Sequence, residues 1–325
     1  LFPHLPALSD HMSPSLPAFD VLALGEVLVD LIGTRPEGTL RETPSFERRQ
    51  GGSPANLVRT VALTGRRAAL VACVGDDGLG AFLHDELGGV GVETRFIRTA
   101  PNAPTSCVLL SRSAATSEFI AYRHADAQLR DDQIPDAVLQ SSSIVHTTAF
   151  ALSREPARSV ILSAVKTAVA AGRRCSIDVN YAPSIWPDRD EAIRVLRDVV
   201  SRASYVKVSD DDLDRLFGTN GSSPDRVQKL HDWGANVVCL TRGPEGCSVS
   251  SEGGADVETV PAAPVDTVAD ATGAGDAFWG GFLAASVDGH DPVRAAHLGS
   301  RVAAQKLRSV GPLTRIDPID GWETG

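Results

Sequence analysis

The sequence predicts an α/β fold in which a central, mostly parallel β-sheet is covered by helices on both faces, with a small second β-sheet beside it. Between residues 143 and 241, short β-branched runs alternate with helical segments, which is the pattern of right-handed βαβ crossovers. Polar residues follow several of these strands directly, as they do around the ligand crevice of open α/β sheets. Residues 33–52 and 93–124 contain alternating stretches that are expected to form the small sheet, a lid over the site.

The composition is that of an ordinary soluble protein. The 325 residues include 42% hydrophobic and 22% charged residues, which is enough to bury a large core. The net charge of −10 argues against nucleic acid or an anionic membrane as the main partner, and no apolar run approaches the length of a membrane span. The five cysteines contain no Cys-x-x-Cys pair, so we expect buried thiols in a cytoplasmic protein and no zinc site.

The single methionine is Met12. Because translation begins with Met, residues 1–11 are expected to be an added or processed extension. Residues 12–325 are expected to form one domain that includes the lid.

The first strand is predicted over residues 20–32, a mostly apolar run that Gly25, Glu26 and Asp30 interrupt. A buried parallel strand is normally apolar throughout, so these acids need an explanation. Asp30 is expected near the strand's end, where it could reach a ligand. The alternative is that Asp30 only caps or solvates the strand end.

A helix is predicted to begin within Gly51-Gly-Ser-Pro-Ala-Asn56 and to end at Gly65. Ser53 is expected as its N-cap and Pro54 as its first helical residue. Asn56 then lies in the first turn, where its amide and the Gly-Gly turn suit a ligand rich in hydroxyl groups. Alternatively, the same residues form only a well-capped helix.

The elements that follow alternate along the chain. Strands are predicted at 67–75, from 92 to 97, 143–147, 174–179, 205–208 and 236–241; a hairpin at 105–123 with its turn near 114–117; helices at 76–87, 155–171, 189–202, 210–217, 224–233 and 292–307; and an irregular strand at 260–269. The polar residues expected at the strand ends are Asp178, Asn180, Ser209, Asp212, Thr241, Gly243 and Gly246.

The stretch Asp270-Ala-Thr-Gly-Ala-Gly-Asp276 is predicted to pass from a loop into a helix. At Gly273, Ala274 and Gly275 the backbone can approach a ligand closely, and the first N–H groups of a helix have no partners of their own. They can therefore bind a phosphate or a developing oxyanion. Asp276 beside such a site is explained if it takes the proton of a hydroxyl that attacks the bound phosphoryl group. The alternative is that Asp276 only offsets the helix dipole and the glycines form a turn.

Together, the segments 51–56 and 270–276 resemble the two signatures of the ribokinase-like (PfkB) carbohydrate kinase family. The resemblance covers roughly residues 18–316. It is greatest to fructokinases, and the segments that carry this likeness are 25–30, 43–46 and 121–126. It implies the ribokinase-like three-layer fold, Asp276 as the base and Gly273 to Gly275 as the anion hole. It further implies a sugar site at Asp30, Gly51, Gly52, Asn56 and Asn180, with Arg123 approaching from the lid, and a nucleotide site at Thr241, Gly243 and Gly246.

Several positions depart from the family pattern. Ser209-Asp-Asp-Asp212 stands where relatives carry Asn-x-x-Glu, which is linked to magnesium and phosphates, and Ser300 stands where a nucleotide-side Asn is common. Both serines are retained in the expected nucleotide site. Ala182 replaces an Arg that lies near a charged ligand in ketodeoxygluconate kinases, and it favours a neutral sugar.

The resemblance implies an ATP-dependent kinase that phosphorylates a hydroxymethyl group of a ketose-like sugar, with fructose as the leading choice. Mg²⁺ is expected on the ATP phosphates rather than in a protein cage, and a monovalent cation such as K⁺ near Asp270 and Gly311 is left open. The alternatives are a 2-keto-3-deoxygluconate kinase, a nucleoside or riboside kinase, and a sugar-binding regulator without catalysis. An oxidoreductase is disfavoured, since the glycine loop does not match Gly-x-Gly-x-x-Gly. A homodimer is expected to cover the exposed edge of the lid.

Overall fold

The computed structural model of the protein describes residues 18–36, 38–112 and 118–323. The expected extension at 1–11 and the hairpin turn near 114–117 lie outside these residues. The large sheet comprises β1 (Val21–Leu24), β4 (Ala68–Gly75), β5 (Ile97–Ala100), β8 (Ile144–Thr148), β9 (Arg174–Asp178), β10 (Tyr205–Ser209), β11 (Val237–Thr241), β12 (Cys247–Ser251) and β13 (Asp256–Val260). Its strand order is β13-β12-β11-β10-β9-β8-β1-β4-β5, and every pairing is parallel except those of β11 with β12 and β12 with β13.

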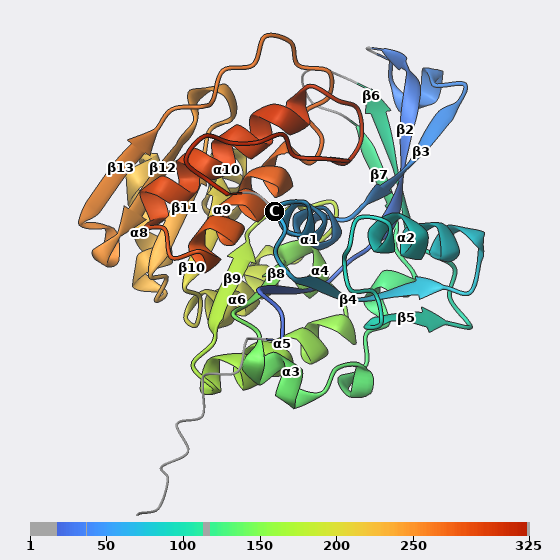
Figure 1. Cartoon of the computed structure of the whole chain (residues 1–325), viewed down its shortest axis with the longest axis horizontal. Helices are drawn as coiled ribbons and strands as arrows, with labels where there is room; N and C mark the ends of the chain where they lie inside the picture. Colours follow the sequence, from blue (N-terminus) through green and yellow to red (C-terminus); the bar gives the residue numbers. More distant parts are fainter. Residues whose placement is uncertain (1–17, 37, 113–117, 324–325) are drawn as a thin grey trace, which may run out of the picture.

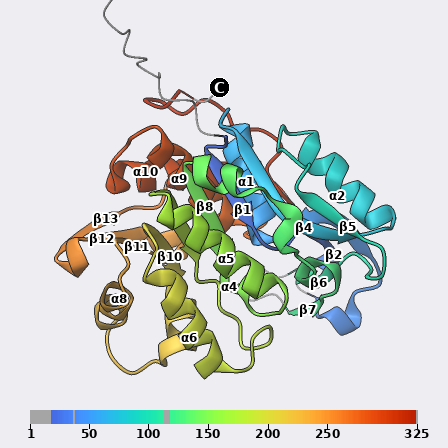
Figure 2. The same cartoon turned by 90° about the horizontal axis from the view of Figure 1, so that it is seen from below.

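Helices cover both faces of this sheet (Figure 2). One face packs against α3 (Asp136–Ser141), α4 (Ala149–Leu152), α5 (Ala157–Ala170), α6 (Arg189–Val200), α7 (Asp210–Phe217) and α8 (Ser223–Asp232). The other packs against α1 (Ser53–Leu63), α2 (Gly78–Gly88), α9 (Ala274–Val287) and α10 (Pro292–Leu307). Each face forms its own apolar cluster, and the predicted three-layer α/β fold is confirmed. Among the described residues, no helix combines the length and apolarity that crossing a membrane requires.

The small sheet stands beside the large one (Figure 1). It comprises β2 (Leu28–Pro36), β3 (Phe46–Gly51), β6 (Cys107–Arg112) and β7 (Phe119–Tyr122) in the order β3-β2-β6-β7. The strands β6 and β7 pair antiparallel, as expected for the hairpin, whereas β2 and β6 run parallel. The small sheet begins earlier than residue 33, and β5 belongs to the large sheet although it lies within 93–124.

The strand predicted over residues 20–32 is wrong as a single element. The chain leaves the large sheet after Leu24 and enters the small sheet at Leu28. Glu26 is buried at the crossing, where its carboxyl accepts hydrogen bonds from Ser53 N–H at 3.2 Å and from Thr148 Oγ1 at 3.1 Å. Asp30 therefore lies within β2, opposite Arg49, and not at the end of a parallel strand.

The region 242–269 also differs from the prediction. The sequence analysis missed β12 and β13 and expected an irregular strand over 260–269, yet only Val260 of that range is in a strand. Four of the five β13 residues are exposed, and an edge strand that is solvated on both faces has no alternation of buried and polar residues to detect. Short 3-10 helices complete the chain at Leu40–Glu42, Ala125–Ala127, Asp131–Gln133, Gly243–Glu245 and Glu252–Gly254.

Candidate active site

The two signature stretches meet where α1 and α9 begin. Ser53 Oγ donates to Asp276 Oδ1 at 2.7 Å, and Asn56 Nδ2 donates to Asp276 Oδ2 at 2.9 Å. The two helices pack very closely, since a Cβ added to Gly280 would lie 2.7 Å from Thr60 Cβ. Segments more than 200 residues apart in sequence thus build one polar cluster.

Ser53 is not the N-cap that the sequence predicts. Gly52 is the N-cap, with φ +98°, and Ser53 is the first helical residue. A Cβ at Gly52 would lie 2.5 Å from the Glu26 carbonyl oxygen, so only glycine fits at this position. As a consequence, the Ser53 hydroxyl is free to bond to Asp276 instead of capping its own helix.

The start of α9 supplies main-chain donors beside Asp276. Gly273 is the N-cap with φ +75°. The Ala274 N–H is already paired, because it donates to the Ala271 carbonyl at 3.1 Å. Among the described residues, the N–H groups of Gly273 and Gly275 have no hydrogen-bond partner. Two of the three expected anion-hole amides are therefore available to a ligand.

The carboxyl group of Asp276 is disposed to accept a proton. Burial and the neighbouring carboxylate of Asp178 raise its pKa, while the hydrogen bonds from Asn56 and Ser53 and the charge of Lys207 oppose this rise. A base with a raised pKa holds a proton better, which is what removing a hydroxyl proton requires.

Lys207 is a site residue that the sequence analysis missed. Its Nζ donates to Asp178 Oδ2 at 2.7 Å, and a Cβ added to Gly275 would lie 3.3 Å from the same Nζ. Burial acts to lower the pKa of Lys207, but Asp178, Asp212 and Asp276 raise it above its usual value, so the ammonium stays charged. A lysine inside the apolar strand Tyr-Val-Lys-Val-Ser was the available signal.

A pocket opens next to this cluster, between the small sheet and the end of α10. Burial, together with the charges of Asp276 and Asp270, raises the pKa of Asp30 to about 7. Gly51 packs directly against this carboxyl, because a Cβ there would lie 2.3 Å from Asp30 Cγ. The lining residues are Asp30, Ile32, Arg49, Gln50, Asn56, Thr60, Thr272, Gly273, Ala277, Lys306, Gly311, Pro312 and Leu313.

The amide of Asn56 is held in one orientation by Gln50. Gln50 Nε2 donates to Asn56 Oδ1 at 2.9 Å, and Gln50 Oε1 in turn accepts from Arg59 Nη1 at 3.4 Å. The Asn56 amide nitrogen consequently faces Asp276. Gln50 is buried immediately before the Gly-Gly turn, and the sequence analysis did not single it out.

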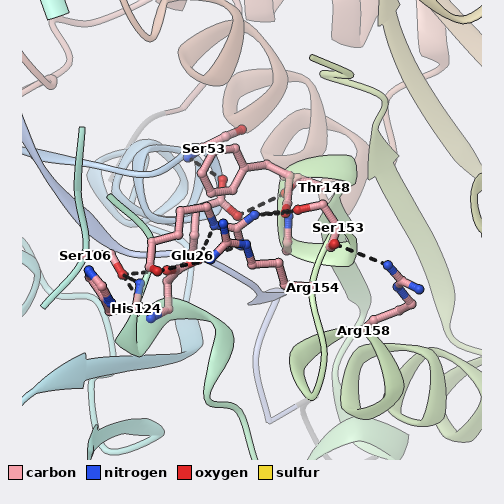
Figure 3. A network of polar contacts seen from close by, with 12 residues as sticks. Glu26, Ser53, Ser106, His124, Thr148, Ser153, Arg154 and Arg158 are labelled. Carbon is pink, nitrogen blue, oxygen red and sulfur yellow. Dashed lines mark hydrogen bonds and ion pairs between the residues drawn. The ribbon is translucent and has the colours of Figure 1, made fainter. Parts of the chain in front are cut away.

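Arg123 and Asn180 both contact the main chain of Phe150. Figure 3 shows the polar network of this region, which includes Ser106 and Ser153 and extends to Glu26 and Ser53. Arg123 Nε and Nη2 donate to Asp126 Oδ2 at 2.8 and 2.6 Å, and Nη1 donates to the Phe150 carbonyl at 3.0 Å. Its side chain is 2% exposed, and it does not line the pocket beside Asp30. Asn180 Oδ1 accepts from the Phe150 N–H at 3.3 Å. The structure thus does not bring these two side chains to the pocket next to Asp276.

The residues expected to hold the nucleotide lie at the ends of β10 and β11 and on α10. Ser209 caps α7 and donates to Asp212 Oδ2 at 2.6 Å. Thr241 ends β11, and Gly243 and Gly246 flank the turn to β12. A Cβ on Gly246 would lie 2.2 Å from the Val260 carbonyl. Ser300 accepts the Ala263 N–H at 2.8 Å and lines a second pocket between residues 261–264 and α10. Within the described residues no cluster of three or more metal-ligating side chains occurs.

The chain is similar in sequence and in fold to known proteins. The family model described as "pfkB family carbohydrate kinase" matches residues 18–318. The chain is 33% identical over 303 residues to an ATP-dependent 6-phosphofructokinase of Thermoanaerobacterium thermosaccharolyticum, covering 93% of this chain and 92% of the relative.

Two solved structures extend the comparison. The fructokinase of Halothermothrix orenii is 32% identical, with a TM-score of 0.77 over 90% of this chain and all of the other. An uncharacterised sugar kinase of Pyrococcus horikoshii in complex with ATP is 27% identical, with a TM-score of 0.79 over 90% of this chain and 93% of the other.

Proposed function

Because the chain belongs to the pfkB family of carbohydrate kinases, it is a sugar kinase, and we propose that it transfers the γ-phosphate of ATP to a hydroxymethyl group of fructose. The observation that carries this proposal is the position of Asp276. Its carboxylate lies in the first turn of α9, next to the open N–H groups of Gly273 and Gly275, and Asn56 joins it to the pocket that Asp30 lines.

In this proposal, the Asp276 carboxylate accepts the proton of the sugar hydroxyl. The hydroxyl oxygen forms a bond to the γ-phosphorus, and the bond from that phosphorus to the β-γ bridging oxygen breaks to release ADP. The amides of Gly273 and Gly275 and the ammonium of Lys207 stabilise the negative charge on the transferring group. A positioned base contributes roughly 10²- to 10⁴-fold, and one oxyanion donor contributes about 10²- to 10³-fold.

The sugar is held by Asp30 and Asn56, with the main chain at Gly51 and Gly52 forming the wall beside them. Asp30 and Asn56 line the pocket, and their oxygen and amide atoms are typical hydroxyl partners. Roles for Arg123 and Asn180 remain predictions from the family resemblance, because both are engaged elsewhere in this structure.

ATP is proposed to lie along the turn of Thr241, Gly243 and Gly246, with its base in the pocket that Ser300 lines. Mg²⁺ would bind the ATP phosphates, and the carboxylates of Asp212 and Asp178 are oxygen donors of the kind that it prefers. When bound, Mg²⁺ would neutralise phosphate charge. A K⁺ near Asp270 and Gly311 would have to share its oxygens with the ammonium of Lys306.

The test is an ATP-coupled assay of ADP release with fructose, fructose 6-phosphate, 2-keto-3-deoxygluconate, ribose and nucleosides. We expect the highest kcat/KM with fructose. Activity on only 2-keto-3-deoxygluconate would show that the protein is a kinase of that sugar. Activity on only nucleosides would show that it is a nucleoside kinase. Sugar binding by calorimetry without ADP release from any acceptor would favour the non-catalytic regulator.

Fructose 6-phosphate is a second candidate because of Arg49. This side chain lines the pocket opposite Asp30, and its Nη2 lies 2.8 Å from Glu47 at a half-exposed position. A guanidinium there could bind the phosphate of a phosphorylated ketose. An Arg49→Met variant that loses activity on fructose 6-phosphate but keeps it on fructose would support this reading.

The lid is proposed to pair with that of a second copy. The edge strand β7 exposes 38% of Phe119, 46% of Ile120 and 49% of Tyr122, and an open apolar edge can be covered by an identical edge. Analytical ultracentrifugation should show a dimer for the wild-type chain and a monomer for Ile120→Lys. A wild-type monomer at micromolar concentration would contradict the proposal.

A further inference from the structure

A buried lysine lies at the end of α10, directly beneath the loop that leads into α9. The Lys306 side chain is 2% exposed. Its ammonium contacts three oxygen atoms: the Asp270 carbonyl at 2.9 Å, Asp270 Oδ2 at 3.1 Å and the Ser309 carbonyl at 3.4 Å. A cluster of carbonyl and carboxylate oxygens around one positive charge is also the environment that a monovalent metal cation would occupy.

Asp270 connects this lysine to the anion-binding loop. Its Oδ1 accepts the Thr272 N–H at 2.9 Å, and its Oδ2 accepts the Gly311 N–H at 3.1 Å. The ammonium therefore ties the end of α10 to the segment immediately before Gly273. The Lys306 stem lies near this turn, because a Cβ added to Gly273 would come within 3.9 Å of Lys306 Cε.

The oxygens around Asp270 do not fit an additional K⁺. The family resemblance leaves such an ion open near Asp270 and Gly311, but the ammonium already contacts Asp270 through both its main-chain and side-chain oxygens. A second cation on the same oxygens would be repelled by roughly 4 kcal/mol at 4 Å for an effective dielectric constant of about 20. The positive charge that these oxygens require is therefore provided by the ammonium of Lys306.

We propose that Lys306 replaces a monovalent cation: it is a positioning residue that holds residues 270–275 in place, so that the kinase needs no K⁺. The ammonium does not touch the reacting atoms. It acts through Asp270 on the orientation of the open amides at Gly273 and Gly275. Although burial acts to raise the pKa of Asp270, the Thr272 amide and the Lys306 charge hold it below the usual range, which keeps the carboxylate charged. Burial lowers the pKa of Lys306, and the charge of Asp270 opposes this change.

The first test uses the wild-type protein in tetramethylammonium chloride and in KCl at equal ionic strength. The measurement of kcat/KM in this test rests on the proposed function. The measurement of Tm does not, so it can be interpreted even when no acceptor is known. We expect equal kcat/KM and equal Tm in the two salts. Specific activation by K⁺, or a rise in Tm that only K⁺ produces, would overturn the proposal.

The second test removes the ammonium with Lys306→Ala and uses Lys166→Met, at an exposed position on α5, as the matched control. Misplacing the loop by about 1 Å should lower kcat/KM roughly a hundredfold in the tetramethylammonium salt. K⁺ or methylammonium should then restore part of the rate and raise the Tm of this variant, with no effect on the control. A Lys306→Ala protein with wild-type rate and Tm would exclude the positioning role. If the variant does not fold, the wild-type comparison still decides.

Discussion

Asp126, which is buried, and Asp276, which is half-buried, differ in the charge of their partners. Asp126 is bound by the guanidinium of Arg123 at 2.6 Å and by the hydroxyl of Ser106. Asp276 accepts hydrogen bonds only from the neutral groups of Ser53 and Asn56, and no ion pair among the described residues includes it. The charge of a carboxylate bound by a guanidinium is compensated by its partner, whereas neutral donors leave the charge uncompensated.

This difference indicates a structural role for Asp126 and favours a chemical role for Asp276. The pair of Arg123 and Asp126 joins the end of β7 to α4 through the Phe150 carbonyl. Asp276 instead combines a raised pKa with open neighbouring amides. In the proposed function, the same residue type serves assembly at one place and proton transfer at the other, and substitutions should separate the two roles.

The largest expected effect is that of Asp276→Asn. The amide keeps an oxygen that Ser53 or Asn56 can bond to, but it cannot accept the hydroxyl proton. We expect kcat to fall by roughly 10²- to 10⁴-fold, with Tm unchanged or higher because the repulsion between the carboxylates of Asp276 and Asp178 is gone. The measurement is steady-state kinetics beside differential scanning calorimetry. Near-normal kcat in a folded variant would refute Asp276 as the base.

The opposite outcome is expected for Arg123→Met. Removing one partner of a buried ion pair leaves Asp126 uncompensated and should cost about 3–5 kcal/mol of stability, measured by urea unfolding. The double variant with Asp126→Asn should recover part of this loss, and the folded fraction of either should retain its kcat. A large fall in kcat at unchanged stability would instead give Arg123 the sugar-binding role that the family resemblance implies.

Sequence reasoning succeeded where glycine spacing and helical periodicity determine the backbone. The two signature segments, the alternating strands and the positions of Asp30 and Asn56 beside the pocket could all be derived or inferred by resemblance. It failed where a side chain's partner is remote in sequence. Serine is a residue type that is common at N-caps, so Ser53 was predicted to cap α1. The N-cap is instead Gly52, one residue earlier, which has a positive φ.

The missed residues share one property: they are buried charged or amide side chains whose partners lie on other elements. Lys207 and Lys306 each pair with an aspartate from another element, and Gln50 orients Asn56. From sequence such a residue can only be recognised as unusual, because its partner is known only after the chain is folded. For the same reason, the ion pair of Arg123 with Asp126 could not be predicted from the sequence.

Ser53→Ala should have an intermediate effect. A hydrogen bond to a charged acceptor contributes about 1.5–3 kcal/mol, and its loss should lower kcat by roughly tenfold or more. Because the Ser53 hydrogen bond holds down the pKa of Asp276, the acidic limb of the kcat profile should move to higher pH. Ser163→Ala, at an exposed position on α5, is the control. An unshifted profile would show that Ser53 does not act on the base.

Acceptor binding should depend on pH through Asp30. Its pKa is about 7, so the carboxylate that accepts hydroxyl hydrogen bonds forms as pH rises through 7, and KM for the sugar should fall over that range. Asp30→Asn should give a higher KM without this dependence. A wild-type KM that is constant from about pH 6 to 8 would contradict the role of Asp30.

The smallest effect is expected for Glu26→Gln at about pH 4. Burial raises the pKa of Glu26 from 4.5 to about 8, so its stabilising effect is complete below the unfolded value of 4.5 and is lost as pH rises from there through about 8. The variant should unfold with a similar free energy at about pH 4 and should lack the wild-type decline between about pH 4.5 and 8. Urea titrations at several pH values measure the free energy of unfolding at each pH. If the variant and the wild type show the same dependence of this free energy on pH, Glu26 is not the group that causes the decline.

The junction at Gly52 has a mechanical consequence. The last residue of β3 is Gly51 and the first of α1 is Ser53. A single residue therefore separates the lid from the helix whose first turn hydrogen-bonds to Asp276. A rotation of the lid would find no long flexible connection to absorb it. We therefore expect such a rotation to shift Ser53 and Asn56, and with them the hydrogen bonds that hold Asp276.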